Sequence, residues 1–408
     1  MTDNIVSDAF EEFNRNMGMG RIQNPYPTFA EMRCELPIQP VDLRKMFGFE
    51  VDDMPADAPP IYTACTYDAV HEILKDGERF SSQIYAGFMG LVMGHTILEM
   101  DEPEHHRYRS LLMQAFSKRA MERWETDLVG PVIDECIDTF ADRGRAELIR
   151  ELTFPFPVNV IAGLLGLPKE DIDQFHVWTV ELISIGFDME KSMRASKALG
   201  DYLREKIEYR RAHLADDFVS VLIKAELDGH SLTDDEIIAF CRLLLPAGAE
   251  TTYRSSSNLI YGLLRNPDQF EALKNDRSLM PKAMEEGLRW EPPLLTIMRT
   301  AVEDTTVCGV PVDKDAVIII NLGSANHDDK RWEQSEELDI LRKQQQHMAF
   351  GFGPHMCLGQ HLARMETRVV MDKIFDRLPN LRLDPAEPDI AITGMTFRTP
   401  QRLPVVFG

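Results

Sequence analysis

Residues Phe350 to Gly359 read FGFGPHMCLG and place one cysteine among three glycines, a proline and a histidine. The segment that follows, CLGQHLARMETRVVMDKIF, has apolar residues at 358, 362, 365, 369 and 370, which is a helical spacing. Cys357 is therefore predicted at or just before a helix N-terminus, where free N–H groups and the helix dipole favour an anion and lower a thiol pKa. Glycines allow positive φ angles and a close approach to a flat surface. The alternative is an ordinary glycine-rich turn with a packed thiol.

The other cysteines give no sign of a metal cluster or of covalent haem attachment. They lie at positions 34, 65, 136, 241 and 308, and no two cysteines form a CxxC pair. We expect these five to pack as small apolar residues. A lone thiolate surrounded by amide donors suits a single metal ligand better than a zinc cluster.

The glycine-rich stretch resembles the haem-binding loop of the cytochrome P450 family, in its soluble bacterial form, at six positions: Phe350, Gly351, Gly353, His355, Cys357 and Gly359. The resemblance implies that the Cys357 thiolate is the axial ligand of the iron of haem b. A thiolate ligand donates electron density and favours cleavage of the O–O bond. The residues implied as further cofactor contacts in this loop are Phe350, Gly351, His355 and Gly359.

A long predicted helix carries a second match to the family, AGAETT at residues 247–252. A capping box opens this helix, with Thr233 as N-cap and Glu236 at the third helical position, and the helix is predicted to stop before Asn266-Pro267. Alone, the Glu-Thr pair would be typical of the solvent face of an amphipathic helix. The residues before it are mostly apolar, however, so the helix is expected to cross the core, where an acid requires a reason.

The resemblance gives this segment a role at the oxygen site. It implies that Ala247 and Gly248 contact the cofactor, and that Glu250 and Thr251 carry protons to bound oxygen. The missing side chain of Gly248 is expected to leave room for a small ligand. Pro246 departs from the family pattern and is expected to bend the helix, since it cannot donate to the carbonyl of residue 242.

Two further segments match the family in the same order along the chain. Glu286 and Arg289 form an ExxR motif whose side chains share a helix face, and the resemblance implies a structural pair that locks the cysteine loop. Basic residues that would neutralise the haem propionates are implied at His105 and Arg109, on a helix starting after Pro103, and at Arg299 and His355. Taken singly, each of these residues would be an ordinary surface charge.

Composition excludes several classes of function. The chain has 408 residues and a formal charge of −23, which argues against general binding to nucleic acids or to anionic membranes. The N-terminal residues MTDNIVSDAFEEFNRN do not form a signal peptide, and no run reaches the roughly 18 apolar residues of a membrane span. We therefore expect a cytoplasmic protein without a membrane anchor.

The expected fold is mainly α with a small β region, in one domain over residues 1–408. Strands are predicted at 61–65, 305–312 and 316–326, and an early helix at 68–80. By resemblance, haem lies between the long central helix and the helix after the cysteine loop.

The implied reaction is hydroxylation by dioxygen, for which electrons must come from another protein. There is no GxGxxG after a strand and no room for a flavin domain. The expected partners are a ferredoxin and its reductase, which uses NAD(P)H. Lys118, Arg119, Arg364 and Arg368 are candidates for a basic docking patch, although ordinary solvated charge explains them equally well.

The implied substrate is a hydrophobic small molecule, because the windows that line the family's substrate pocket are apolar here and carry no anchoring cation. A neutral terpenoid, steroid or aromatic compound is favoured over a fatty acid. The predicted lining residues are Phe88, Met89, Leu91, Met93, Leu244, Leu294, Leu295, Ile297, Met395 and Phe397. Three alternatives stay open: a peroxide-driven peroxygenase, a non-catalytic haem sensor, and a protein without haem that has a reactive Cys357.

Overall fold

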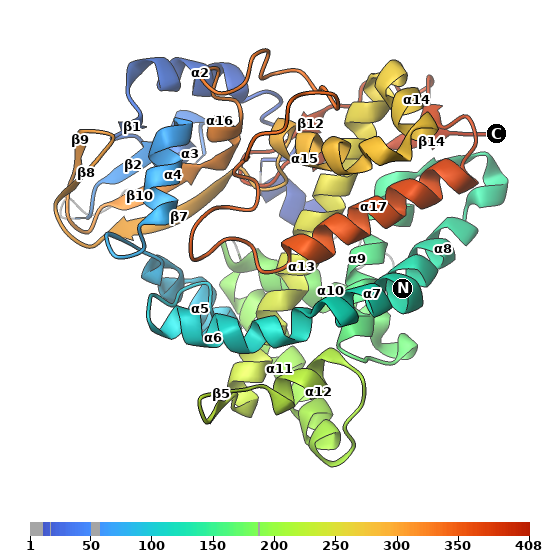
Figure 1. Cartoon of the computed structure of the whole chain (residues 1–408), viewed down its shortest axis with the longest axis horizontal. Helices are drawn as coiled ribbons and strands as arrows, with labels where there is room; N and C mark the ends of the chain where they lie inside the picture. Colours follow the sequence, from blue (N-terminus) through green and yellow to red (C-terminus); the bar gives the residue numbers. More distant parts are fainter. Residues whose placement is uncertain (1–10, 17, 50–57, 187) are drawn as a thin grey trace.

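A helical part and a smaller β part make up the chain, as the computed structural model shows (Figure 1). The structure describes residues 11–16, 18–49, 58–186 and 188–408. The protein is 56% helical with a minor sheet component, which confirms the predicted fold class. None of the helices in the described ranges combines the length and the apolar character needed to cross a bilayer.

Sixteen labelled α-helices follow a short helical segment at residues 11–16. They are α2 (Tyr26–Glu35), α3 (Leu43–Met46), α4 (Tyr67–Lys75), α5 (Met89–Met93), α6 (Glu104–Met113), α7 (Lys118–Trp124), α8 (Gly130–Asp138), α9 (Pro155–Leu164), α10 (Ile172–Leu182), α11 (Met189–Ala212), α12 (Phe218–Lys224), α13 (Asp234–Arg265), α14 (Pro267–Asn275), α15 (Met280–Trp290), α16 (Leu322–Asn326) and α17 (Gln360–Arg377). A π-helical segment, Glu125–Val129, joins α7 to α8.

The main sheet has five strands in the order β1-β2-β10-β7-β3. Their bounds are Ile38–Gln39, Ile61–Ala64, Val317–Asn321, Thr296–Ala301 and Phe80–Ser81. Strand β10 is parallel to β2 and antiparallel to β7, and this register sets Arg299 of β7 opposite Ile318. Figure 1 shows this sheet beside α2, α4 and α16, on the side of the molecule away from α17 and α8.

Smaller strands complete the β part. A three-stranded sheet has the order β11-β14-β4 (Arg382–Leu383, Pro404–Val406 and Arg145–Glu147). The two-stranded ladders are β5-β6 (Glu226–Leu227, His230–Ser231), β8-β9 (Thr305–Val307, Val310–Val312) and β12-β13 (Ile392–Thr393, Thr399–Pro400).

The strand predictions need two corrections. The stretch 305–312 was expected as one strand, but it is a hairpin of β8 and β9 that turns at Cys308 and Gly309, both with positive φ. The stretch 316–326 was expected to be extended throughout, but only Val317–Asn321 is a strand, and α16 takes the rest. The reason is local: the Asn321 side chain accepts a hydrogen bond from the Ser324 N–H at 2.9 Å and caps a new helix. The early helix predicted at 68–80 is present as α4, but it ends at Lys75, and Phe80 belongs to strand β3.

Helix α13 runs through the centre of the helical part and packs on α9, α11, α15 and α17. Its predicted start is confirmed, because the Thr233 side chain accepts from the Glu236 N–H and the Glu236 side chain accepts from the Thr233 N–H. The helix continues through Pro246 to Arg265 and ends, as predicted, before Asn266-Pro267. The proline therefore does not terminate α13, and its neighbours Leu244 and Leu245 are buried.

Candidate active site

The loop before α17 is shaped by glycines that no other residue could replace without strain. Gly351 and Gly353 have φ of 69° and 70°, and a Cβ on Gly353 would lie 2.2 Å from the Leu74 carbonyl oxygen. The Cys357 N–H donates to the Phe350 carbonyl at 2.8 Å and closes the loop. Gly359 differs from the prediction: its φ is −83°, it is the N-cap of α17, and a Cβ there would meet no atom within 4 Å.

Cys357 is half-buried at the head of α17, and two opposing effects act on its thiol. Burial is the larger effect and raises the pKa of Cys357, whereas the N–H groups of Gly359 and Gln360 and the guanidinium groups of Arg109 and Arg364 lower it. The predicted net lowering by the helix N-terminus is therefore wrong for the free thiol. A bound metal cation would reverse the balance, because a coordinating thiol loses its proton.

Four basic residues predicted to neutralise propionates converge beside the cysteine loop. The helix predicted after Pro103 is α6, and it carries His105. This histidine is 1% exposed, and its ring centroid lies 3.9 Å from that of His355. Arg299 is buried, and Arg109 donates to the Met356 carbonyl at 2.6 Å. Burial lowers the pKa of His355 to about 2, and Arg299, His105 and Arg109 add to this effect. The two histidines are therefore neutral, and the guanidinium groups of Arg109 and Arg299 are the charges at this site that favour an anionic ligand.

One atom of this group lacks a partner. The Nδ1 of His105 pairs with Glu102 at 3.1 Å, but its buried Nε2 has no hydrogen-bond partner among the described residues. His355 uses its own Nε2 in a hydrogen bond with the Ser82 hydroxyl at 3.1 Å. Buried polar atoms are nearly always paired, so the His105 Nε2 indicates a ligand position.

In the central segment of α13, Ala247 is exposed although the helix crosses the core. The Thr251 hydroxyl donates to the Ala247 carbonyl at 2.8 Å. A Cβ on Gly248 would lie 2.7 Å from the Cδ1 of Ile161, so the missing side chain lets α9 pack closely on α13. The contact of Gly248 with the cofactor stays a prediction.

Glu250 is buried and its carboxylate is held by Arg254, one turn along α13. The Glu250 Oε2 accepts from Arg254 Nε at 3.0 Å and from Nη2 at 2.9 Å. Burial raises the pKa of Glu250, while Arg254 opposes this shift. Glu250 and Thr251 therefore use different partners, one the guanidinium and the other the backbone.

The predicted pair Glu286 and Arg289 is buried and satisfied on every side. Two hydrogen bonds of 2.8 and 2.9 Å join the side chains. Arg289 also donates to the carbonyls of Asn326, Ser335 and Glu337 at 3.1, 2.7 and 2.9 Å. The pair thus ties α15 to the segment that leads into the cysteine loop.

The predicted pocket residues separate into groups. Phe88, Met89, Met93, Leu244 and Phe397 belong to or pack against one apolar cluster that includes α13. The backbone of Leu294 forms a β-bridge with Phe397. Three others pack elsewhere, because Leu295 and Met395 join a cluster with Tyr26 and Phe29, and Ile297 packs against the main sheet. Leu91 is 59% exposed on α5 and points away from the interior.

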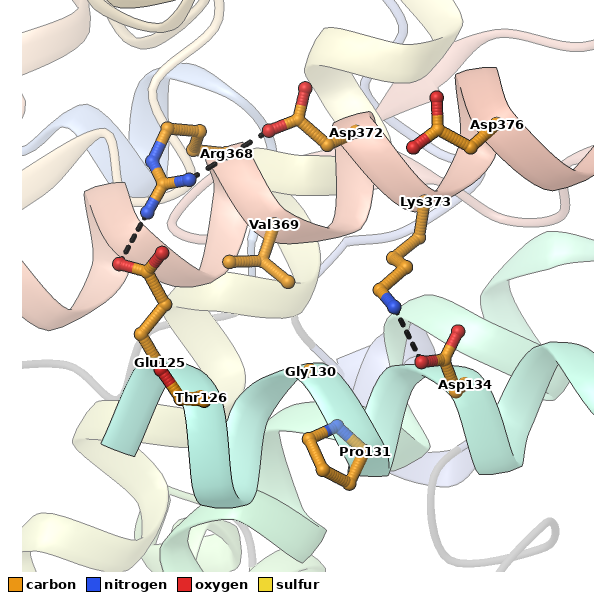
Figure 2. A pocket seen from close by; sticks show the side chains of 10 residues that line it. All are labelled: Glu125, Thr126, Gly130, Pro131, Asp134, Arg368, Val369, Asp372, Lys373 and Asp376. Atoms are coloured by element: carbon orange, nitrogen blue, oxygen red, sulfur yellow. Dashed lines mark hydrogen bonds and ion pairs between the residues drawn. The ribbon is translucent and has the colours of Figure 1, made fainter. Parts of the chain in front are cut away.

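The four basic residues predicted for the docking patch differ in whether carboxylates pair with them. Arg364 forms two hydrogen bonds with Glu285, at 2.6 and 2.9 Å. Arg368 lies between Glu125 and Asp372 in a charged groove of about 390 Å³ between α17 and the α7–α8 segment (Figure 2). Lys118 is exposed and pairs with Glu122 at 3.8 Å, and Arg119 is also exposed.

Several residues near the site were not identified from the sequence. Arg254 could have been found, since Glu250 and Arg254 are four apart on a predicted helix. Asn14 binds Arg254, Tyr85 lies beside Arg299, and the fully buried Glu366 contacts Thr252. These three contacts join residues far apart in the chain, so no sequence spacing indicates them.

Comparisons with known proteins agree on one family. The family model described as Cytochrome P450 matches residues 174–400. The chain is 31% identical to the putative cytochrome P450 YjiB of Bacillus subtilis, over 92% of this chain and 93% of that protein. It is 34% identical to a steroid C26-monooxygenase of Mycobacterium tuberculosis, over 86% and 96%. The crystal structure of CYP109E1 from Bacillus megaterium with testosterone superposes with a TM-score of 0.83 at 32% identity, over 94% of this chain and 99% of that chain.

Proposed function

The chain belongs to the cytochrome P450 family of monooxygenases, and from this premise we propose that it hydroxylates a neutral lipophilic small molecule, using dioxygen and electrons from a ferredoxin. The observation that carries the proposal is the position of the Cys357 thiol at the head of α17, beside the guanidinium groups of Arg109 and Arg299 and the unpartnered Nε2 of His105.

Haem fits the residues around Cys357. Its two propionates are anions that the guanidinium groups of Arg109 and Arg299 can pair with, and a propionate beside His105 would favour the protonated imidazole, whose Nε2 then donates to it. The open space at Gly359 and the exposed Ala247 leave room beside the loop and beside α13. We propose that Cys357 holds the iron, that His105, Arg109, Arg299 and His355 hold the propionates, and that haem supplies the iron chemistry of oxygen activation.

The chain's own residues control the electron density at the metal. The N–H groups of Gly359 and Gln360 and the cations Arg109 and Arg364 all stabilise negative charge on the Cys357 sulfur. They would temper the donation from sulfur to iron. The buried Glu286–Arg289 pair acts only indirectly, by fixing the segment that precedes the loop.

Protons for the reaction are proposed to come through α13. Thr251 would hold a proton at its hydroxyl next to the Ala247 carbonyl, and Glu250 would replace that proton from its carboxyl group. Positioned groups of this kind typically accelerate proton transfer by about 10²–10⁴-fold. A peroxide-driven enzyme has less need of such a pair, which favours the dioxygen reaction.

The electron donor is proposed to be a ferredoxin, reduced by an NAD(P)H-dependent reductase in the cytoplasm. Because the protein carries a formal charge of −23, an acidic donor would require local cations. Lys118 and Arg119 are exposed, whereas Arg364 and Arg368 are engaged by carboxylates. We therefore favour the first two as docking contacts.

The substrate class is inferred from the apolar group Phe88, Met89, Met93, Leu244 and Phe397. The guanidinium of Arg254 lies beside Phe397, but Glu250 already pairs with its charge, so it is not offered to a carboxylate of the substrate. Two relatives carry steroid names, one a steroid C26-monooxygenase and the other a structure with testosterone. Titration of the ferric protein with testosterone and with palmitate, followed by the optical spin-state shift, tests this proposal. A larger shift with palmitate would contradict it.

One spectrum tests the haem-thiolate centre. The reduced protein with carbon monoxide should give the far-red-shifted Soret band of a thiolate haem, and Cys357→Ser should lose it. Cys136→Ser, which alters another buried thiol on α8, is the matched control and should keep the band. If Cys357→Ser keeps the band, another ligand holds the iron and the proposal fails. Turnover with peroxide that equals turnover with ferredoxin would favour the peroxygenase alternative.

A further inference from the structure

Glu250, Arg254 and Asn14 form a buried polar cluster that joins α13 to the N-terminal segment of the described chain. Arg254 is 0% exposed, and besides its two hydrogen bonds to Glu250 it donates from Nη2 to the Asn14 side-chain oxygen at 2.8 Å. Asn14 belongs to the helical segment at residues 11–16 and is itself buried. The N-terminal segment thus reaches the residue that holds the proposed proton-carrying acid.

Two polar atoms of this cluster have no hydrogen-bond partner among the described residues. They are the Glu250 Oε1 and the Arg254 Nη1, and both are buried. A buried ion pair is worth forming only if its remaining polar atoms are also satisfied, and unpaired atoms of this kind usually mark an ordered water. Since Oε2 is occupied by the guanidinium, Oε1 is the carboxyl oxygen able to exchange a proton.

Aromatic rings enclose the guanidinium and connect it to the substrate side. The Arg254 Cζ lies 5.8, 4.7 and 5.1 Å from the ring centroids of Phe13, Tyr253 and Phe397. Phe397 belongs to the apolar group proposed to meet the substrate. The cluster therefore joins three parts of the chain: the N-terminal segment at residues 11–16, helix α13, and the C-terminal segment that carries Phe397.

We propose that Arg254 and Asn14, the latter from the N-terminal helical segment, are positioning residues for Glu250 in the proton path. Arg254 and Asn14 fix the Oε2 of Glu250 and leave its Oε1 free to exchange protons. For each proton that Glu250 passes toward Thr251, Oε1 takes one proton from water. The carboxyl group thus returns to its starting state, and no electron is transferred. This inference rests on the proposed function. A merely structural ion pair would affect folding and not the use of protons.

The experiment compares variants of the full-length holoenzyme. The set is Glu250→Gln, Arg254→Gln, Arg254→Lys, Asn14→Ala and Asn16→Ala. Asn16→Ala is the matched control, because it changes the same residue type two positions away at an exposed site. Three readouts are taken: the carbon monoxide spectrum, the ratio of peroxide formed to dioxygen consumed as a function of pH, and the infrared C=O band of a protonated buried carboxyl group.

We expect every variant to retain the thiolate spectrum, which shows that the site is intact. Arg254→Gln should gain a protonated-carboxyl band that a second change, Glu250→Gln, removes. It should also lower coupled turnover about tenfold or more, with an altered pH profile, as loss of a positioned proton donor predicts. Asn14→Ala should lower coupling to a smaller extent, Arg254→Lys should restore part of it, and Asn16→Ala should match the unaltered protein.

Two results would overturn the inference, and they are distinguishable. If Glu250→Gln is uncoupled while both Arg254→Gln and Asn14→Ala couple normally, the proton relay stands and the positioning role is wrong. If Glu250→Gln itself couples normally, the proposed relay fails and this inference fails with it. If Arg254→Gln does not fold, Asn14→Ala and Arg254→Lys decide the question by the same criteria.

Discussion

Glu366 on α17 carries a pH dependence of stability that one substitution should remove. The side chain is 1% exposed, and its Oε1 has no hydrogen-bond partner among the described residues. Burial raises the pKa of Glu366 from the usual 4.5 to about 8, although a hydrogen bond with Thr252 partly opposes the shift. Below pH 4.5 both the folded and the unfolded chain keep this proton, so the group costs no stability. As the pH rises toward 8, the unfolded chain releases the proton but the folded chain retains it.

The magnitude follows from this difference in pKa. Each pH unit between the unfolded and the folded pKa costs about 1.4 kcal/mol of unfolding free energy, so the cost reaches about 3 kcal/mol at pH 7 and about 5 kcal/mol above pH 8. Glu366→Gln abolishes the titration. Its amide introduces a buried donor without a partner, which costs about 1–3 kcal/mol at any pH. The amide cost is the same at every pH, so it shifts the difference in unfolding free energy between variant and parent by a constant. The change of that difference with pH therefore reports the titration of Glu366 alone.

The assay is denaturant unfolding of the parent and of Glu366→Gln at several pH values from 5 to 8. We expect the stability of the variant relative to the parent to rise by about 1.4 kcal/mol per pH unit. Glu205→Gln, which alters an exposed glutamate of α11, is the matched control and should show a constant difference. Parallel pH profiles for Glu366→Gln and the parent would refute the reasoning, since Glu366 would then titrate as it does in the unfolded chain.

Three further predictions concern the site. Thr251→Ala should keep haem and substrate binding but divert reducing equivalents to peroxide, measured as peroxide per dioxygen consumed; unchanged coupling would reject the relay. Glu286→Gln leaves the buried Arg289 charge uncompensated and should lower unfolding free energy by about 3–5 kcal/mol in denaturant titrations, and a loss below 1 kcal/mol would mean that the pair is not needed. Gly353→Ala forces a Cβ to 2.2 Å from the Leu74 carbonyl and should abolish haem retention in the carbon monoxide spectrum, so normal haem content would contradict this loop geometry.

Local features of the site were predictable because they depend on neighbours in the sequence. The capping box at Thr233 and Glu236 and the i, i+3 pairing of Glu286 with Arg289 follow from helix geometry alone. The positive φ angles of Gly351 and Gly353 follow from a tight loop that only glycine enters without strain. These signals, with the strand at residues 61–64, were enough to predict the fold class and to bring Cys357 to the head of a helix.

Only the tertiary structure decided the pKa of Cys357, the use of the space at Gly248 and the residue that holds Arg254, the partner of Glu250, because contacts between distant segments set each of them. The helix N-terminus favours a thiolate at Cys357, but the depth of burial, which comes from distant segments, raises its pKa instead. The space opened by Gly248 is taken by Ile161 of another helix. The Arg254 guanidinium that holds Glu250 is itself held by Asn14, which comes from the other end of the chain. Sequence spacing determines which side chains share a face, whereas desolvation and partner choice depend on contacts between remote segments and exist only in the folded chain.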